Sequence, residues 1–359
     1  MKLLFDGHLD LALFALAWNR DATETAAKIN RREQGMAGFG WGCASVSLPE
    51  LRKGAVAVCQ STVAARAHRG KPPPQGYNRT DLDFGTQDIA YAYAQGQLAY
   101  YRALQNQGEV NLIGSASQLK RHWDTWSKVN EYSNLPVGII VSMECADPIV
   151  EPSQATEWFE DGVRSVSLAH FGFGHYAQGT GTSGPLTSKG LELLQEFESV
   201  GMILDLTHTA DEGFFQALDA FGGPVIASHT NCRALVPGDR QFSDEQLRLL
   251  IDRGAIIGTA FDAWMLVPGW IVFESKPGDL RMETVVDHID HICQLSGNVV
   301  HAAIGTDTGT TDHMPVDYRT SADLQELPEL LGRRGYTEGD VNRILHRNWL
   351  EYFLKHLPE

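Results

Sequence analysis

The segment Leu3-Leu4-Phe5-Asp6-Gly7-His8-Leu9-Asp10 decides how the rest of the sequence can be interpreted. It is a short apolar run that ends in the pattern His-x-Asp. Because side chains alternate between the two sides of an extended strand, His8 and Asp10 point the same way and can reach one point at the strand's end. An imidazole and a carboxylate that converge are suited to a divalent transition metal. The pattern is weak alone, and its weight depends on the residues at the ends of the later apolar runs.

Length and composition limit the classes of protein to which the chain can belong. It has 359 residues, 43% of them hydrophobic, which is enough for a sizeable core. The formal net charge is −16 and the sequence has no basic stripe, so we expect no nucleic acid partner. No uninterrupted apolar stretch of about 18 residues occurs, so we expect no membrane span.

Cysteine usage and the first residues bear on the cellular compartment. The five cysteines are odd in number and widely spaced, and no Cys-x-x-Cys pair occurs, which indicates neither a zinc knuckle nor a disulfide framework. Polar residues interrupt the first apolar run, and no small-residue cleavage site follows it. These features favour a cytoplasmic protein with free thiols.

Apolar runs of strand length alternate with segments of helical spacing along the chain. The expected strands are 3–8, 41–48, 137–143, 163–168, 202–206, 224–228, 255–261 and 301–306. The expected helices are 87–106, 187–199, 211–220, 243–253, 282–295 and 338–355. Ser243 with Gln246 resembles a capping box at the start of one of these helices. Residues 110–113 are an extra strand or a helix lead-in.

This alternation predicts a parallel sheet closed into a (β/α)8 barrel of the TIM type, with residues 1–359 as one domain. The alternative is an open doubly wound sheet, which is disfavoured because no glycine-rich phosphate loop follows the first strand. The longest irregular stretch, Gly70–Gly85, is expected to be a surface excursion or a lid over one end of the barrel.

Six of the eight expected strands end in a residue that can bind a metal. In a parallel barrel these positions meet at the carboxyl ends of the strands, where barrel active sites are built. Each residue alone could be structural, but together they predict a metal site. Four imidazoles and three carboxylates exceed the three protein ligands of one catalytic zinc ion, so two ions are expected. The residues are His8, Asp10, Glu144, His170, His208, His229 and Asp307. Glu144 is the plausible bridge, since no lysine lies at these strand ends.

With these residues in order, the chain resembles the membrane (renal) dipeptidase family, peptidase family M19 of the amidohydrolase superfamily, from Asp6 to about Phe353. The family's strand-eight pattern matches Gly305-Thr306-Asp307-Thr308-Gly309. Its bridging glutamate is followed by Gly-Gly or Gly-Ala, whereas this chain has Glu144-Cys145-Ala146-Asp147, a difference that leaves the substrate preference open. The resemblance implies metal ligands at His8, Asp10, Glu144, His208 and His229.

The resemblance also implies a mechanism and an arrangement of the ions. Two Zn²⁺ ions, or other divalent ions such as Mn²⁺ or Co²⁺, share Glu144 and a bridging hydroxide. One ion is held by His8, Asp10 and Glu144, and the other by Glu144, His208 and His229. The catalytic residues are then Glu144, His170, which also binds the substrate and steadies the oxyanion, and Asp307, which moves the proton to the leaving amine.

The implied substrate is a small dipeptide, either L,L or with a D-residue in second place. Arg240 is expected to bind its terminal carboxylate, with Arg233 as the alternative. A homodimer is compatible with the family. Other readings keep the metals but change the substrate to another small amide, a lactone or a cyclic imide, or to a deamination. A further reading is a metal-binding barrel without turnover.

Overall fold

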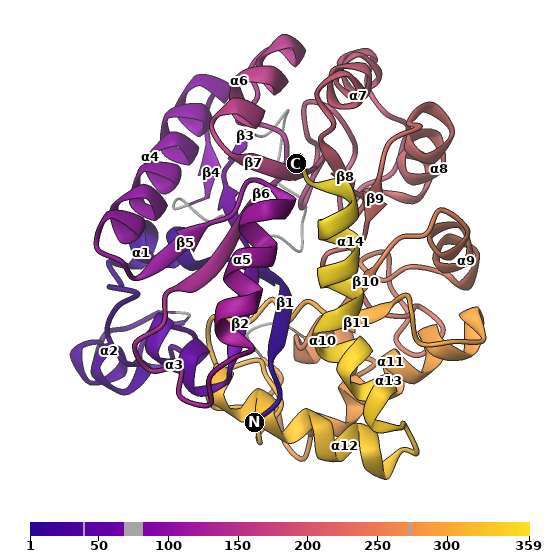
Figure 1. Cartoon of the computed structure of the whole chain (residues 1–359). Coiled ribbons are helices and arrows are strands. Elements are labelled where there is room, and N and C mark those ends of the chain that lie inside the picture. The colour runs from indigo at the N-terminus through magenta and orange to yellow at the C-terminus, as the bar shows by residue number, and fades with distance from the viewer. Residues whose placement is uncertain (39, 68–81, 272–273) are drawn as a thin grey trace.

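The computed structural model describes residues 1–38, 40–67, 82–271 and 274–359 and shows a curved parallel sheet inside a ring of helices (Figure 1). Eight parallel strands among these residues build the barrel, and each is almost completely buried. In chain order they are β1 (Leu4–Leu9), β2 (Val56–Ala64), β6 (Val137–Glu144), β7 (Val163–Ser167), β8 (Ile203–Asp205), β9 (Val225–Ile226), β10 (Ile257–Thr259) and β11 (Ala302–Ile304).

The strands follow one another around the barrel. β1, β2, β6, β7, β8 and β9 pair consecutively, and β10 pairs with β11. A parallel bridge just after β9 links that strand to β10. The barrel closes between β11 and β1 through side-chain and backbone hydrogen bonds. Thr306 donates to the Asp6 carboxylate from its N at 2.8 Å and from its Oγ1 at 2.6 Å. Asp307 N donates to His8 O at 3.2 Å. The predicted (β/α)8 barrel is confirmed.

Helices surround the strands, and several of them match the sequence prediction closely. The expected helices 87–106 and 211–220 coincide with α4 and α8, and both hydrogen bonds of the capping box between Ser243 and Gln246 are present. The helices are α1 (Leu11–Trp18), α2 (Ala26–Arg32), α3 (Leu48–Lys53), α4 (Gln87–Asn106), α5 (Ala116–Trp126), α6 (Ala155–Glu160), α7 (Ser188–Val200), α8 (Asp211–Ala220), α9 (Asp244–Asp252), α10 (Ala263–Leu266), α11 (Glu283–Ser296), α12 (Leu327–Arg333), α13 (Glu338–Asn342) and α14 (Asn348–His356). Residues 110–113 give the short strand β5 (Val110–Leu112).

The expected strand at 41–48 is wrong, and the second barrel strand is β2, which was not predicted from the sequence. The middle of β2 is polar, which resembles a loop in the sequence. These side chains are nevertheless buried, because they bond the backbone of β1: Gln60 Nε2 donates to Gly7 O at 2.8 Å, and Ser61 Oγ donates to Leu9 O at 3.0 Å. Residues 41–48 instead form turns that lead into α3.

The carboxy-terminal helix α14 covers the end of the barrel where the strands begin, and it lies in front of the strands in Figure 1. Asn348 Nδ2 donates to Ala302 O at 2.8 Å, and Tyr352 Oη donates to Val225 O at 2.7 Å, so α14 bonds the first residues of β11 and β9. The ring of Phe353 stacks on Phe5 of β1 with 5.4 Å between centroids. The opposite end of the barrel is left for the carboxyl ends of the strands.

The segment after β2 brings a second, smaller sheet to that open end. Strand β3 (Arg66–Ala67) pairs in parallel with β4 (Asp83–Phe84), and Arg66 lies opposite Asp83 in the register. Most of the predicted excursion at 70–85 lies outside the described residues, so its role as a lid remains a prediction.

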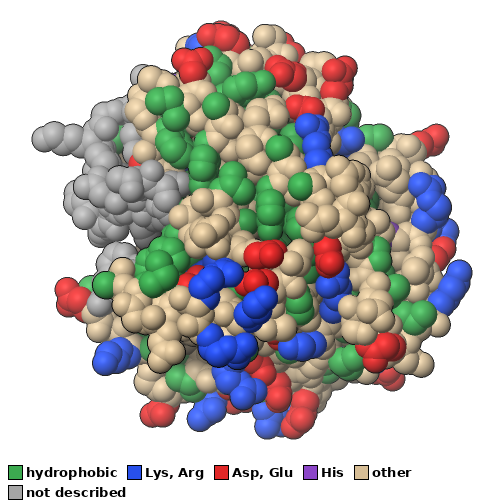
Figure 2. All heavy atoms as spheres, turned by 90° about the vertical axis from the view of Figure 1, so that its left-hand side faces the viewer, with side chains coloured by type: hydrophobic (Ala, Val, Ile, Leu, Met, Phe, Trp, Pro, Cys, Tyr) green, Lys and Arg blue, Asp and Glu red, His purple; other side chains and the backbone are tan. Residues whose placement is uncertain are grey.

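Figure 2 shows the face that lies on the left in Figure 1. Basic and acidic side chains are interspersed there, and they do not form a uniformly basic surface. Across the described residues, none of the helices combines the length and the hydropathy that a membrane crossing requires.

A buried histidine outside the open end predicts how stability depends on pH. His288 of α11 accepts a hydrogen bond from Cys232 N at 3.0 Å, and burial lowers its pKa from 6.5 to about 4. The unfolded chain therefore takes up this proton first as the pH falls. His288 therefore leaves the free energy of unfolding unchanged above pH 6.5. As the pH falls toward 4, His288 lowers that free energy by up to about 3 kcal/mol.

We therefore expect His288→Asn, which keeps an acceptor near the position of Nδ1, to show a flatter fall of unfolding free energy with acidification than the wild type. Urea unfolding of both proteins between about pH 7.5 and 4.5 measures the difference, since the other titrating groups are shared. Parallel curves for the two proteins would contradict the assignment.

Candidate metal centre and substrate pocket

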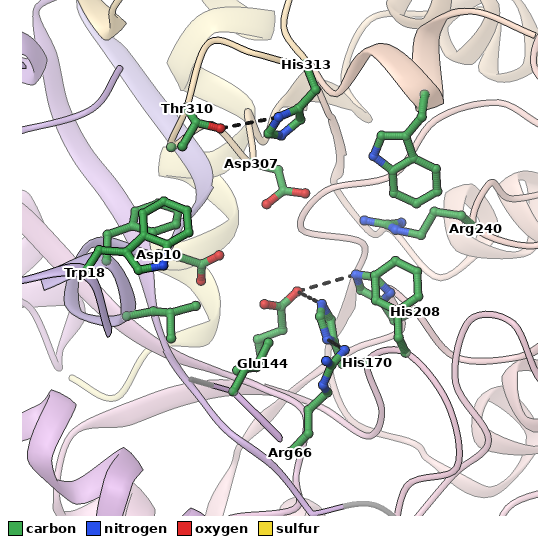
Figure 3. A pocket seen from close by; sticks show the side chains of 16 residues that line it. Asp10, Trp18, Arg66, Glu144, His170, His208, Arg240, Asp307, Thr310 and His313 are labelled. Atoms are coloured by element: carbon green, nitrogen blue, oxygen red, sulfur yellow. Dashed lines mark hydrogen bonds and ion pairs between the residues drawn. The ribbon is translucent and has the colours of Figure 1, made fainter. Parts of the chain in front are cut away.

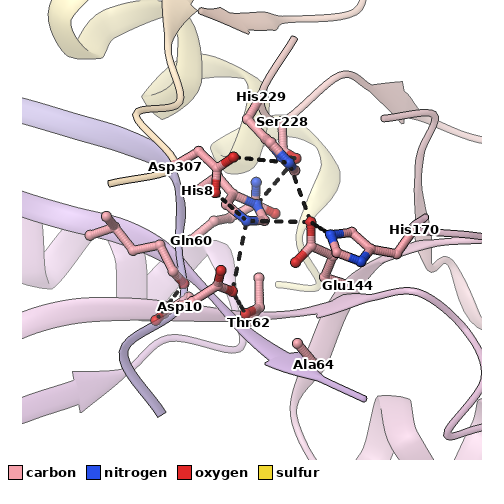
Figure 4. A network of polar contacts seen from close by, with 12 residues as sticks. His8, Asp10, Gln60, Thr62, Ala64, Glu144, His170, Ser228, His229 and Asp307 are labelled. Atoms are coloured by element: carbon pink, nitrogen blue, oxygen red, sulfur yellow. Dashed lines mark hydrogen bonds and ion pairs between the residues drawn. The ribbon is translucent and has the colours of Figure 1, made fainter. Parts of the chain in front are cut away.

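All seven candidate residues lie at or just beyond the carboxyl ends of barrel strands, and the structure brings them together (Figures 3 and 4). His8 is within β1 and Asp10 is the residue before α1. Glu144 is the last residue of β6. The remaining four follow β7, β8, β9 and β11 in turn, and they are His170, His208, His229 and Asp307.

One oxygen of Glu144 lies at the centre of four imidazole rings. Glu144 Oε1 is 3.3 Å from the Nε2 atom of His229, 3.4 Å from that of His208, 3.5 Å from that of His170 and 3.7 Å from that of His8. Each imidazole comes from a different strand, so the barrel itself sets these distances. A single carboxylate therefore contacts every histidine of the predicted site.

The donor spacing fits metal coordination. In a tetrahedral shell with bonds of about 2.0–2.2 Å, neighbouring donor atoms lie roughly 3.3–3.6 Å apart. Three sets of donor atoms have all members within 4.8 Å of one another, and Glu144 belongs to two of them. Among the described residues, His8 Nε2 is buried and has no hydrogen-bond partner, as expected of a nitrogen whose lone pair is meant for a cation. The sets are His8–Glu144–His229, Glu144–His170–His208 and His8–Asp10–Asp307.

The second nitrogen of two histidine ligands is held by a neighbouring hydroxyl. Thr180 Oγ1 lies 2.9 Å from His208 Nδ1, and Ser228 Oγ lies 2.8 Å from His229 Nδ1. Thr62 of β2 donates a hydrogen bond to Asp10 (Figure 4). Such outer partners fix the ring orientation and raise the basicity of a metal ligand.

The electrostatics of the cluster also favour a cation. Burial lowers the pKa of His208 and His229 well below the usual value, so both imidazoles are neutral and able to coordinate. Burial, reinforced by the charges of Asp10 and Asp307, raises the pKa of Glu144 well above its usual value. Crowded buried carboxylates beside neutral imidazoles are stabilised when a divalent ion supplies the missing positive charge.

Three site residues adopt backbone conformations that L-residues rarely use. The φ angles are 66° at Cys145, 67° at His208 and 55° at Asp307. The left-handed angle at Cys145 gives a physical reason for the glycine that the family places after its bridging glutamate. In this chain, hydrogen bonds hold the strained residue: Cys145 N donates to Ser167 Oγ at 3.0 Å and its Sγ donates to Ala65 O at 3.1 Å.

The cluster forms the floor of a pocket at the carboxyl ends of the strands. Apolar side chains wall it on two sides. Those from α1 are Leu13, Phe14 and Trp18, and those across the pocket are Phe171 and Trp264. Figure 3 shows Trp18 and Arg240 at opposite sides, with Glu144 and Asp307 between them. The carboxylates of Glu144 and Asp307 therefore lie between the two sides of the pocket.

The two candidate arginines lie in different surroundings. Arg240 is buried in the pocket lining, and its Nη2 donates to His229 O at 2.9 Å. Its Nε and Nη1 have no hydrogen-bond partner among the described residues. Arg233 instead binds both carboxylate oxygens of Asp211 at 2.8 and 2.7 Å and does not line the pocket. The geometry therefore favours Arg240 as the group that awaits a ligand.

Sequence reasoning missed two charged groups that line the pocket. Arg66 follows β2, a strand that was not recognised, so no signal pointed to it. His313 lies between Asp262 (2.9 Å) and Asp312 (2.8 Å). Burial alone would lower the pKa of His313, but these two carboxylates raise it to about 10, so His313 is an imidazolium. The one sequence feature that could have indicated His313 is its position beside Asp312, close to Asp307.

Comparisons with known proteins agree with this architecture. The family model of the membrane dipeptidases, peptidase family M19, matches residues 2–355. An uncharacterised protein encoded in the pqqA 5′ region of Klebsiella pneumoniae is 30% identical over 203 residues, which are 54% of this chain and 72% of that protein. Dipeptidase tcpJ of Claviceps purpurea is 30% identical over 194 residues, which are 52% of this chain but 43% of that enzyme.

Solved structures show the same fold over the whole length. Dipeptidase AC, a metallopeptidase of family M19, superposes with a TM-score of 0.78 at 20% identity and covers 100% of this chain and 99% of its own. A metallopeptidase from Rhodobacter sphaeroides, liganded with a phosphinate mimic of the dipeptide L-Ala-D-Ala, gives 0.77 at 21% identity and covers 99% and 100%. The family model, matched across nearly every residue, shows that this chain belongs to the membrane dipeptidase family, peptidase family M19.

Proposed function

We propose that the protein is a metal-dependent dipeptidase that holds two Zn²⁺ ions and cleaves a small dipeptide. The observation that carries this proposal is the position of Glu144, whose Oε1 lies within 3.7 Å of four imidazole nitrogens and can be shared by two ions. Membership of the family and the pocket above the cluster support the same function. A homodimer, a single domain and a cytoplasmic location remain predictions.

The chemistry follows from the groups around the pocket. Bound divalent ions would polarise the peptide carbonyl and lower the pKa of a water to about 7. Asp307 lies 3.7 Å from His8 Nε2 and 3.9 Å from His229 Nε2, at the edge of the ligand set. Burial, reinforced by Asp262, raises the pKa of Asp307, which suits a group that accepts a proton and passes it on. Asp307 then protonates the leaving amine.

Arg240 and the apolar walls would orient the substrate. Arg240 can offer a forked pair of N–H groups to a terminal carboxylate, a planar match that lysine cannot reproduce. Its Nη2 uses one of two protons for His229 O, and Nε and Nη1 on either side of Nη2 have no partner among the described residues. Figure 3 shows Asp10 and Trp18 on the side of the pocket away from Arg240, so the amino end of the dipeptide would lie toward them. This orientation places the peptide bond over Glu144 and makes a free carboxylate a requirement for tight binding.

Metal analysis joined to a substrate panel tests the proposal. We expect the protein purified with zinc to contain about two ions per chain and to hydrolyse L,L- or L,D-dipeptides. Chelation should abolish the activity, and added Zn²⁺ should restore it. A metal-loaded protein that cleaves neither kind of dipeptide, but does cleave a lactone or a cyclic imide, would overturn the substrate assignment.

Arg240→Lys should separate carboxylate binding from catalysis. The ammonium keeps the charge but loses the fork, so we expect KM for dipeptides to rise about 10-fold or more with a smaller change in kcat. The matched control is Arg233→Lys, which alters an arginine of the same loop outside the pocket and should leave KM near the wild-type value. Steady-state kinetics with a dipeptide and with its carboxamide measure both effects. An equal effect of Arg240→Lys on the two substrates would contradict the role.

A further inference from the structure

The fourth histidine around Glu144 differs from the others in the partner of its second nitrogen. Arg66 Nη1 lies 2.9 Å from His170 Nδ1 (Figure 3). A guanidinium carries donors only, whereas the hydroxyls beside His208 and His229 can also accept a hydrogen bond. His170 Nδ1 must therefore be the acceptor in its contact with Arg66.

This contact decides which form of the imidazole faces the pocket. A neutral imidazole has one protonated nitrogen and one lone pair. When the lone pair of Nδ1 is used by Arg66, the proton of His170 lies on Nε2, the atom 3.5 Å from Glu144 Oε1. That atom can donate a hydrogen bond but cannot bind a metal, although its position alone would allow it to join the set with Glu144 and His208.

Arg66 is itself firmly held. Its side chain is 2% exposed, and it forms a fork with Asp83, Nε to Oδ1 at 2.6 Å and Nη2 to Oδ2 at 2.9 Å. The two residues lie opposite each other in the β3–β4 pair. The neighbouring Ala67 N donates to the buried carboxylate of Asp147 at 2.9 Å, which anchors β3 to the loop after β6. The guanidinium therefore has one orientation, with Nη1 directed at His170.

We propose that Arg66, fixed by Asp83, is a positioning residue that holds His170 in the Nε2–H form and so makes it a hydrogen-bond donor to the substrate instead of a metal ligand. This inference rests on the proposed dipeptidase function for its kinetic consequence. The group that contacts the second ring nitrogen thus distinguishes the histidines that bind metal from the one that donates a hydrogen bond. A preorganised donor of this kind acts on the oxygen that becomes negative during peptide cleavage.

The proton position can be measured without any turnover. Histidine labelled with nitrogen-15 in the metal-loaded protein at about pH 8 reports which ring nitrogen is protonated, and the His170 signals are those missing from His170→Gln. We expect a proton on Nε2 and none on Nδ1 in the wild type, and loss of this preference in Arg66→Met. A wild-type signal with the proton on Nδ1, or on both nitrogens, would overturn the proposal.

Kinetics supply the second test. Arg66→Met should lower kcat about 10-fold or more, with KM and metal content nearly unchanged, and Arg66→Lys should recover part of the loss because an ammonium also donates. In a His170→Gln background, Arg66→Met should cause no further loss, since it acts through the missing imidazole. Losses that multiply in the double variant would show that Arg66 acts otherwise.

A control variant and the wild-type spectrum distinguish a role of Arg66 from a folding defect and from a failure of the proposed function. Arg102→Met on α4 breaks an exposed ion pair with Asp161 (2.6 Å) away from the pocket, and should leave kcat unchanged. If Arg66→Met does not fold, the wild-type spectrum still decides where the proton lies. If the loaded wild type cleaves no dipeptide while Nε2–H is observed, the proposed function fails and the positioning by Arg66 stands.

Discussion

Asp307→Asn is expected to lower kcat/KM for dipeptides by roughly 10²–10⁴-fold while both metal ions stay bound. An amide has nearly the same size as the carboxylate but cannot accept the proton that the leaving amine requires. Asp307 lies at the edge of the cluster, and Glu144 with the histidines remains to hold the ions. Metal content measured beside steady-state kinetics separates the loss of proton transfer from a loss of metal.

Asp317→Asn provides the control for this variant, since Asp317 follows the same strand but binds Met282 N at 2.9 Å away from the pocket. It should retain wild-type turnover. If Asp307→Asn kept near-normal activity, another group would have to carry the proton. If it lost a metal ion instead, Asp307 would be a ligand, as its grouping with His8 and Asp10 allows.

Glu144→Gln should have two opposite effects. We expect it to weaken metal binding by more than the 10–100-fold that follows loss of an outer hydrogen-bond partner, and to abolish hydrolysis. Without metal, the same change should stabilise the fold. The pKa of Glu144 is raised by burial and by the charges of Asp10 and Asp307, so this carboxyl group lowers the stability of the metal-free fold at neutral pH, and a neutral amide removes this effect.

Thermal unfolding with a chelator and with added Zn²⁺ measures both effects. We expect the midpoint of Glu144→Gln to lie above that of the wild type in the chelator and below it with zinc. Glu50→Gln is a suitable control, because Glu50 is also buried but lies on α3 and pairs with Lys53 at 2.9 Å. A Glu144→Gln protein that unfolds at a lower temperature than the wild type in the chelator would contradict this electrostatic account.

Much of this architecture could be predicted from the sequence, because the strands that carry the site are apolar runs followed by a polar residue. The pattern at His8 and Asp10, and the single residues after β8 and β9, depend only on local alternation and on where a strand stops. Helix α4 was predictable for the same reason, since its apolar spacing and its bounds are local properties. The structure gathers all seven candidates at the strand ends into one cluster, whereas Arg233 lies outside it.

The features that could not be predicted depend on partners that are distant in the sequence. Strand β2 was missed because its polar centre is satisfied by the backbone of β1, which no local pattern reveals. Arg66 and Asp83 acquire their meaning only when β3 and β4 pair beside His170. The imidazolium of His313 likewise requires Asp262, which comes from the loop after β10. Tertiary contacts of this kind determine the protonation and the hydrogen bonds of a side chain, but they leave no periodic pattern in the sequence.

The carboxylate of Asp6 accepts two hydrogen bonds from Thr306 and so helps to close the barrel between β1 and β11. This contact has a consequence for biosynthesis. His8 emerges from the ribosome near the start of translation, whereas Asp307 emerges only after most of the chain has been made. The nascent polypeptide therefore carries all five expected metal ligands before Asp307 and the last barrel strand have been made. A chain released early would lack both the contact between Asp6 and Thr306 and the proposed acid–base group Asp307, so we expect truncated products to be inactive.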